Sequence, residues 1–110
     1  MRMRKKKNLV PRMERCAGVQ VMDPASLKGR WRSLMPQAVQ LRVELGCGKG
    51  RFTVDTAQAH PDMLFIAIER VPDALVVAME RAVELGLENV RFVVGDASEL
   101  TGYFAPGEAD

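Results

Sequence analysis

The feature that most constrains this fold is an alternation of strand-like and helix-like segments that begins at Val39. Residues 39–45 alternate apolar and polar side chains with a period of two, which is typical of a β-strand. Residues 63–68 (MLFIAI) are continuously apolar, as in a strand covered on both faces, and residues 90–94 (VRFVV) indicate a third strand. Helices predicted between these strands favour parallel neighbours with right-handed crossovers, so we expect an α/β fold.

The two intervening helices have recognisable boundaries. Residues 51–59 follow a glycine-rich turn and are predicted to stop before Pro61. The second helix is predicted to begin at Pro72 and to close at Gly86, which suits the position just after a helix C-cap. Its apolar side chains fall on one face: Leu75, Ala78, Met79 and Ala82.

Residues 1–38 lack this alternation, so we predict a basic N-terminal arm there and an α/β unit over residues 39–110. Prolines at positions 11, 24 and 36 are expected to interrupt any long element of the arm. A short helix is predicted over residues 24–35, with Asp23 as its N-cap. Trp31, the only tryptophan, is expected to anchor the arm to the α/β unit.

The net charge of +2 hides a strong asymmetry along the chain. Residues 1–40 carry ten Lys or Arg against two acids, whereas residues 41–110 carry six against twelve. The first seven residues hold five of the basic side chains: Arg2, Arg4, Lys5, Lys6 and Lys7. Such a run favours contact with a polyanion.

Composition argues against a membrane-spanning, secreted or metal-binding protein. No apolar run approaches the roughly 18 residues of a membrane-spanning helix, and no apolar segment of a secretory signal follows the basic start. The two cysteines show no metal-binding spacing and His60 is the only histidine, so no metal site is expected. We therefore expect a cytoplasmic protein with reduced thiols and no membrane contact.

Three candidate sites fall at the carboxyl ends of the three predicted strands, where open α/β sheets bind ligands. The first is the turn ELGCGKG at residues 44–50, whose glycines allow a ligand to approach the main chain. Lys49 is followed by glycine rather than Ser or Thr, so the turn is not a Walker A loop. Its GxGxG spacing also departs from the GxGxxG of dinucleotide-binding folds.

The second and third sites are Glu69 and the segment Gly95, Asp96 and Ala97. Glu69 lies about 20 residues beyond the glycine turn, where a carboxylate can accept hydrogen bonds from both ribose hydroxyls. Asp96 can accept from an adenine amino group, and the small Ala97 leaves room for the ring. Each feature alone also has a purely structural explanation. The glycine turn could be only a tight turn, Glu69 only a solvated strand end, and Asp96 only the N-cap of a short helix over residues 98–104. Together they indicate a nucleoside site.

These motifs carry a family resemblance. ELGCGKG resembles motif I of class I methyltransferases, and residues 43–110 resemble the N-terminal half of bacterial tRNA (guanine-N7)-methyltransferases. The matching stretches are ELGCGKGRF, AHPDMLFIAIER, LGLENVRFVVGDA and YFAPGEAD, and the opening MRMRKKK and LKGRW are also similar. The resemblance implies a Rossmann-like class I methyltransferase fold, truncated after the third strand.

The resemblance also implies site roles. Glu44, Glu69 and Asp96 are expected to contact S-adenosylmethionine, with Glu44 near its methionine end, and Gly46 and Gly48 to shape the turn. The reaction implied is methyl transfer to N7 of a guanosine in the variable loop of tRNA. The family continues with an NFSDPWPK-like segment that forms the guanine site, so catalytic residues are not expected in this chain, and the chain alone is expected to be inactive.

Other interpretations stay open at this point. The chain could be a truncated, non-catalytic fragment that associates with itself through an exposed sheet edge. It could belong to a class I methyltransferase with another substrate, or least plausibly to a nicotinamide oxidoreductase. Cys47 is a possible nucleophile, although the turn itself requires only a small residue there. Lys49 and Arg51 fit either an RNA contact or a solvated face.

Overall fold

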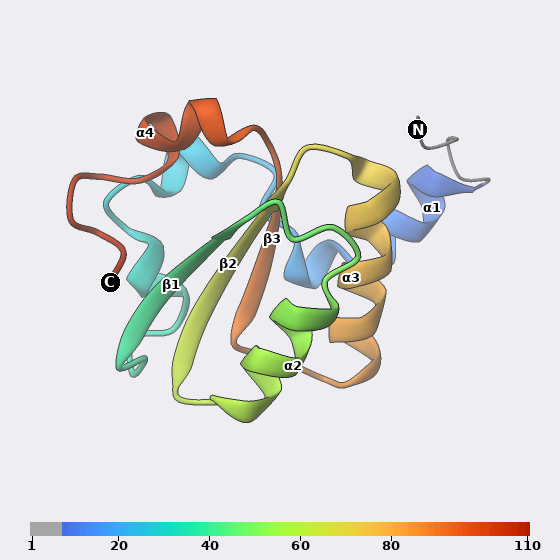
Figure 1. Ribbon diagram of the computed structural model, residues 1–110, viewed down its shortest axis with the longest axis horizontal. Helices are drawn as coiled ribbons and strands as arrows, with labels where there is room; N and C mark the ends of the chain where they lie inside the picture. The colour runs from blue at the N-terminus through green and yellow to red at the C-terminus, as the bar shows by residue number, and fades with distance from the viewer. Residues whose placement is uncertain (1–7) are drawn as a thin grey trace.

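The computed structural model describes residues 8–110, and its centre is a three-stranded parallel sheet (Figure 1). The strands are β1 (Gln40–Leu45), β2 (Met63–Glu69) and β3 (Val90–Val94), in the order β1-β2-β3. β1 pairs with β2 so that Glu44 lies opposite Ala67, and β2 pairs with β3 so that Ile68 lies opposite Val93. The expected α/β arrangement with parallel neighbours is confirmed.

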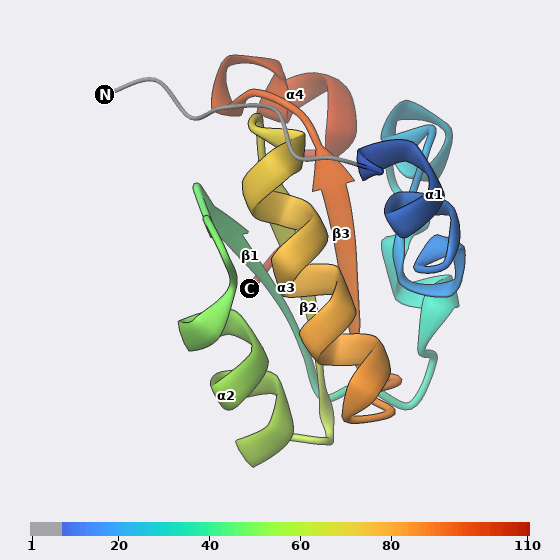
Figure 2. The ribbon, with the colours of Figure 1, turned by 90° about the vertical axis from the view of Figure 1, so that its right-hand side faces the viewer.

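The two connecting helices, α2 (Arg51–Ala59) and α3 (Pro72–Glu84), cover one face of the sheet (Figure 2). Gly86 follows the C-cap of α3 with φ 66°, a left-handed conformation that glycine adopts without a steric penalty. Its N–H donates to the carbonyl of Val83, and the N–H of Leu87 donates to that of Ala82. These paired bonds satisfy carbonyls that the helix end leaves without partners, and they confirm the expected ending.

Two apolar cores lie on opposite faces of the sheet. One joins β2 and β3 to the inner faces of α2 and α3, where Leu75, Ala78, Met79 and Ala82 are fully buried as expected. The other lies on the face occupied by the arm and the C-terminal segment, and it contains Trp31 with alternate residues of β1 and β2. β2 is therefore covered on both faces, as its continuous apolar run predicts.

The arm differs from its expected structure. It contains one α-helix, α1 (Leu9–Glu14), and three 3₁₀ turns, η1 (Ala17–Val19), η2 (Pro24–Leu27) and η3 (Trp31–Leu34). The helix predicted over residues 24–35 is wrong, because Gly29 adopts φ 78° between η2 and η3 and the Asp23 side chain caps neither turn. Pro11 lies in the first turn of α1, where a missing N–H costs no hydrogen bond.

Contacts on both sides attach the arm to the α/β unit. The Arg12 guanidinium binds the Glu80 carboxylate on α3, with Nε at 2.9 Å from Oε2. Next to β3, the N–H of Val21 donates to the carbonyl of Phe92 at 2.9 Å. Trp31 is fully buried, which confirms that it anchors the arm.

The C-terminal segment runs through η4 (Ala97–Glu99) and α4 (Leu100–Tyr103), and only Ala97 lies outside the helix expected over residues 98–104. At its end, Asp110 reaches the outer edge of β1, where its N–H donates to the carbonyl of Leu41 and its carboxylate accepts from the Leu41 N–H, both at 2.8 Å. Among residues 8–110, no strand pairs with that outer edge. No helix in that range combines the length and apolar character needed to cross a membrane.

Candidate functional site

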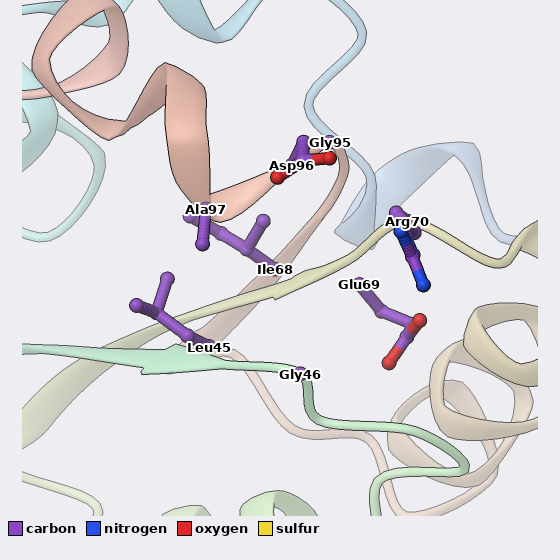
Figure 3. A pocket seen from close by; sticks show the side chains of 8 residues that line it. All are labelled: Leu45, Gly46, Ile68, Glu69, Arg70, Gly95, Asp96 and Ala97. Carbon is purple, nitrogen blue, oxygen red and sulfur yellow. The ribbon is translucent and has the colours of Figure 1, made fainter.

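A pocket of about 310 Å³ opens at the carboxyl ends of the three strands (Figure 3). It lies within the size range of small-molecule sites, at the lower end. Its walls come from all three strand ends: Leu45, Gly46, Ile68, Glu69, Arg70, Gly95, Asp96 and Ala97. Residues separated by about 50 positions in the sequence therefore share one cavity, as the parallel topology requires.

The turn after β1 requires its glycines. Gly46, Gly48 and Gly50 all have positive φ, between 58° and 73°, where other residues are strained. The N–H of Gly46 donates to the carbonyl of Ile68 at 2.7 Å, which fixes the turn beside β2. Gly50 also packs against α3, since a Cβ built on it would lie 2.3 Å from the Cβ of Ala78. The turn is therefore held in place by both its backbone conformation and its packing.

Backbone N–H groups orient the half-buried carboxylate of Glu69. The Gly48 N–H donates to Oε1 and the Val71 N–H donates to Oε2, each at 2.9 Å. Each carboxylate oxygen can accept more than one hydrogen bond, so both oxygens remain able to accept from a ligand. Gly48 does not line the pocket itself, but through this bond it positions a side chain that does. The arrangement suits a pair of neighbouring hydroxyl donors.

Asp96 lines the other side of the pocket and caps η4. Its carboxylate accepts from the N–H of Ser98 at 3.0 Å, which confirms the N-cap expected from the sequence. Hydrogen bonds from the backbone and side chain of Ser98 lower the pKa of Asp96, and the positive charge of Arg70 acts in the same direction. Asp96 is therefore an anionic acceptor at neutral pH. Ala97 follows it as a small, exposed residue at the rim.

Glu44 lies elsewhere, which corrects the expectation that three carboxylates converge. It lines a separate hollow beside α2, together with Phe52 and Phe65, and accepts a hydrogen bond from the Thr53 hydroxyl. Successive side chains of a strand point to opposite faces, so Glu44 points away from the face that carries Leu45. The structure thus brings Glu69 and Asp96 together but leaves Glu44 outside their pocket.

Several residues in and around this pocket were not predicted from the sequence. Arg70, Leu45 and Ile68 line it, and a signal was available because all three adjoin the predicted strand ends. Tyr103 was also missed: its hydroxyl lies 2.6 Å from the position of a Cβ built on Gly95, and it donates to Glu99 at 3.2 Å. Burial raises the pKa of the Tyr103 phenol, so it stays protonated at neutral pH. No local pattern links Tyr103 to Gly95, eight residues earlier in the sequence.

Cys47 fits a structural role better than a nucleophilic one. Burial raises the pKa of its thiol to about 12, and the negative charges of Glu44 and Glu69 act in the same direction. The thiolate is the reactive form, so this cysteine is chemically quiet at neutral pH. Lys49 and Arg51 are both exposed, which leaves their assignment open. The basic residues Arg2, Arg4, Lys5, Lys6 and Lys7 lie outside the described residues.

The parallel sheet, the glycine turn and two acids at neighbouring strand ends define half of a Rossmann-like methyltransferase fold. Two solved structures are similar at this level. One is described as an antibiotic-related methyltransferase, with a TM-score of 0.56 and 24% identity, over 64% of this chain and 37% of that chain. The other is the antibiotic-resistance methyltransferase Kmr, with a TM-score of 0.55 and 25% identity, over 62% and 37%.

The sequence profile of a family described as "Putative methyltransferase" matches residues 38–110, and the chain belongs to this family. Among curated relatives, the tRNA (guanine-N(7)-)-methyltransferase of Geobacillus kaustophilus is 44% identical over 80% of this chain and 41% of its own length. The enzyme of the same name from Limosilactobacillus fermentum is 40% identical over 100% of this chain and 51% of its own length. The chain therefore spans about half the length of these relatives.

Proposed function

We propose that this chain supplies the cofactor-binding half of an S-adenosylmethionine-dependent tRNA (guanine-N7)-methyltransferase. The observation that carries the proposal is the pocket in which Glu69 and Asp96 meet at neighbouring strand ends. The names of the relatives, which match the chain at 40–44% identity, support the same activity. The whole enzyme transfers a methyl group to N7 of a guanosine in the variable loop of tRNA.

The described residues suit this cofactor. Glu69 accepts the ribose hydroxyls, because its two oxygens are held side by side by backbone donors. Asp96 accepts from the adenine amino group, and Ala97 leaves room for the ring next to the apolar side chains of Leu45 and Ile68. Gly46 and Gly48 shape the turn along which the methionine part lies.

Glu44 is retained in the proposal as the acid at the methionine end. Its side chain is bound by Thr53 on the α2 side of the turn. It therefore acts on the ligand's positive charge from the far side of the glycine turn, or exchanges the Thr53 bond for one to the ligand ammonium. Either route makes its contribution weaker than that of Glu69, whose carboxylate already lines the pocket.

The proposed methyl transfer requires little acid–base catalysis by the protein. S-adenosylmethionine supplies the methyl group when it is bound. N7 of guanine carries a lone pair and no proton, so no general base is required. The residues of this chain bind and orient, and orientation contributes up to roughly 7–11 kcal/mol in favourable systems. N7 faces the deep, narrow groove of an RNA helix, so a nucleotide in a loop is the accessible target.

The RNA contact is assigned to the basic start of the chain: Arg2, Arg4, Lys5, Lys6 and Lys7. These residues would neutralise tRNA phosphates. The division into an arm over residues 1–38 and a cofactor-binding half over residues 39–110 belongs to the same proposal, as does a cytoplasmic location. The arm also contributes Leu9, Cys16 and Trp31 to the two cores, so it supports the fold as well.

Calorimetric titration with S-adenosylhomocysteine and with NAD tests the cofactor. We expect the homocysteine compound to bind and NAD not to bind. Glu69→Gln should weaken binding by roughly 10- to 100-fold, since hydrogen bonds to a charged acceptor are worth about 1.5–3 kcal/mol. Glu88→Gln, at an exposed acid between α3 and β3, is the matched control and should leave the affinity unchanged. Tighter binding of NAD, or an unaffected Glu69→Gln, would overturn the assignment.

A second proposal concerns the chain on its own, because it spans about half the length of its relatives. We propose that it does not methylate tRNA unaided and that it associates with itself along β1. The outer edge of β1 pairs with no strand among residues 8–110. Phe52 beside it is 72% exposed and Leu45 is 46% exposed. Asp110 bonds this edge at Leu41, and the part beyond Leu41, flanked by apolar side chains, favours pairing with another chain.

Sedimentation velocity tests this second proposal. The wild-type chain should sediment as a dimer or larger species, and Phe52→Glu should shift it towards monomer. Val10→Glu is the matched control, because Val10 is 60% exposed on α1, away from β1. A monomeric chain that methylates tRNA would contradict both parts.

A further inference from the structure

We infer that Tyr103 is a positioning residue for the pocket: its hydroxyl holds the Gly95–Asp96 backbone so that Asp96 faces the ligand. Tyr103 lies at the end of α4, is 8% exposed, and does not line the pocket. Its effect on a ligand therefore passes through the residues that do. The part of this inference that concerns the cofactor rests on the proposed function, whereas the part that concerns the backbone does not.

The first support is the close approach of the hydroxyl to Gly95. A Cβ built on Gly95 would lie 2.6 Å from the hydroxyl oxygen and 3.0 Å from Cε2 of the ring. A side chain at position 95 would have to displace the phenol, which packs closely on the backbone that leads from β3 into the pocket. Gly95 has an ordinary backbone conformation, so the requirement for glycine comes from this contact rather than from strain.

The second support is the bond to Glu99. The hydroxyl donates to Oε2 of Glu99 at 3.2 Å, and Glu99 belongs to η4, the turn that Asp96 caps. The N–H of Glu99 donates in turn to the carbonyl of Asp96 at 2.9 Å. The hydroxyl thus lies between the end of β3 and the turn that follows it. Its removal would free both sides of the Asp96 backbone together.

The third support is that the arm holds the backbone of Tyr103 in place. Trp31 Nε1 donates to the carbonyl of Tyr103 at 2.7 Å, and the Trp31 ring stacks on Phe104 with centroids 4.9 Å apart. Trp31 is itself fully buried. The arm therefore holds the backbone from which the buried Tyr103 ring extends towards Gly95.

Amide hydrogen exchange of the ligand-free chain tests the backbone part directly. Tyr103→Phe keeps the ring and removes only the hydroxyl. We expect the amides of residues 95–99 to exchange several-fold faster, while those of β2 keep their rates. Thr101→Val is the matched control, because it removes an exposed hydroxyl from the same helix without touching Gly95. Unchanged exchange at residues 95–99 in Tyr103→Phe would overturn the inference, whatever the ligand result.

Titration with S-adenosylhomocysteine tests the consequence for the ligand. Tyr103→Phe should weaken binding by about 3- to 10-fold, the range that the loss of one hydrogen bond produces, and Thr101→Val should bind like wild type. If the wild-type chain does not bind the compound, the proposed function fails for this chain and the exchange measurement alone decides the role of Tyr103. Equal affinities of wild type and Tyr103→Phe would overturn the ligand part.

A rescue experiment separates positioning from a general loss of stability. Gly95→Ala places a methyl group against the hydroxyl and should disturb the backbone at residues 95–99. In the double variant Gly95→Ala with Tyr103→Phe, removal of the oxygen relieves the closest of these contacts. The double variant should therefore exchange more slowly at residues 95–99 than Gly95→Ala alone. Two merely destabilising changes would instead add, and an additive result would count against direct contact.

Discussion

Gly50 shows how a single residue position holds the pocket turn in place. Its φ of 73° is left-handed, and an added Cβ would lie 2.3 Å from the Cβ and 3.0 Å from the Cα of Ala78. The backbone of α3 cannot move away as a flexible side chain could. We predict that Gly50→Ala lowers the free energy of unfolding by roughly 2–4 kcal/mol, from overpacking and backbone strain together. Urea unfolding followed by circular dichroism measures this change.

Gly86→Ala separates the two contributions. Gly86 has a similar φ of 66°, but an added Cβ would meet nothing within 4 Å. The free energy of unfolding that Gly86→Ala loses should therefore come from backbone strain alone, roughly 1–2 kcal/mol. If both variants lose the same amount, the contact between Gly50 and Ala78 contributes nothing to stability.

Cys47 gives a second prediction at the residue scale, through its chemistry. Burial first, and then the charges of Glu44 and Glu69, raise the pKa of its thiol to about 12. At pH 8 the thiolate fraction is then roughly two-thousandfold below that of an ordinary cysteine with a pKa near 8.5. Alkylation of Cys47 by iodoacetamide should be slower by that factor and should accelerate about tenfold per pH unit above pH 8. Mass spectrometry of the labelled peptide gives the rate.

The urea-unfolded chain is the control for this rate, because unfolding removes the burial that raises the pKa. Fast alkylation of the folded chain at pH 8 would refute the structural role and reopen the nucleophilic one. If the thiol only fills space in the turn, Cys47→Ser should keep the affinity for S-adenosylhomocysteine.

The residue scale also shows where sequence reasoning succeeds and fails. Glu69 and Asp96 could be located because an apolar run marks the end of each strand: Glu69 is the last residue of β2, and Asp96 lies two residues beyond β3. Glu44 could not be assigned to the pocket by spacing alone. The same period of two that predicts β1 places Glu44 and Leu45 on opposite faces of the sheet. The alternation therefore indicates that Glu44 points away from Leu45, whereas the short distance in sequence to the glycine turn does not.

Among the elements, those with strong periodicity were predictable. α2, α3 and β3 begin and end where the sequence indicates, and β1 and β2 each differ from their predicted ranges by one residue. The arm was not predictable, because its turns depend on contacts with distant residues. η2 and η3 are held by Glu108, whose carboxylate accepts from the N–H groups of Gly29, Trp31 and Ala105 at 2.8–3.0 Å. No local pattern signals a partner almost 80 positions away.

Glu108 therefore makes the attachment of the arm depend on pH. Burial alone would raise its pKa, but hydrogen bonds from Ala105, Gly29 and Trp31 outweigh it and the pKa is lowered. A carboxylate with a lowered pKa in the folded state stabilises fully above its unfolded pKa, and that contribution disappears as pH falls through the folded value. We predict that stability declines below about pH 4.5, the usual region for Glu, and that Glu108→Gln declines less.

Fluorescence of Trp31 during urea unfolding at pH 7 and at pH 3.5 measures this difference, since Trp31 is the only tryptophan. Glu108→Gln should be less stable than wild type at pH 7 and closer to it at pH 3.5. Glu14→Gln, at an exposed acid on α1, is the control and should leave the pH dependence unchanged. An equal decline in wild type and Glu108→Gln would assign the acid sensitivity to other carboxylates.

At the scale of the whole molecule, the boundary between basic and acidic parts of the sequence is not a boundary in the packing of the fold. The basic front and the acidic remainder differ in charge, yet the arm packs into both apolar cores. The described part of the arm is therefore structurally part of the α/β unit, although its charge differs from that of the remainder. Charge asymmetry of this kind bears on the choice of partner and not on the fold, which the alternation of apolar residues determines.

The salt dependence of tRNA binding tests this division. Each neutralised phosphate adds roughly 0.7–0.9 to the slope of log affinity against log salt, so loss of five contacts would reduce the slope by about 3.5–4.5. We predict a reduction within that limit when Arg2, Arg4, Lys5, Lys6 and Lys7 are all replaced by Gln, measured by fluorescence anisotropy between low and physiological salt. Arg81→Gln, at an exposed position on α3, should change the slope by less than one contact. An unchanged slope in the five-residue variant would move the RNA contact to the exposed Lys49, Arg51 and Arg70 around the pocket, and the arm would then serve the fold alone.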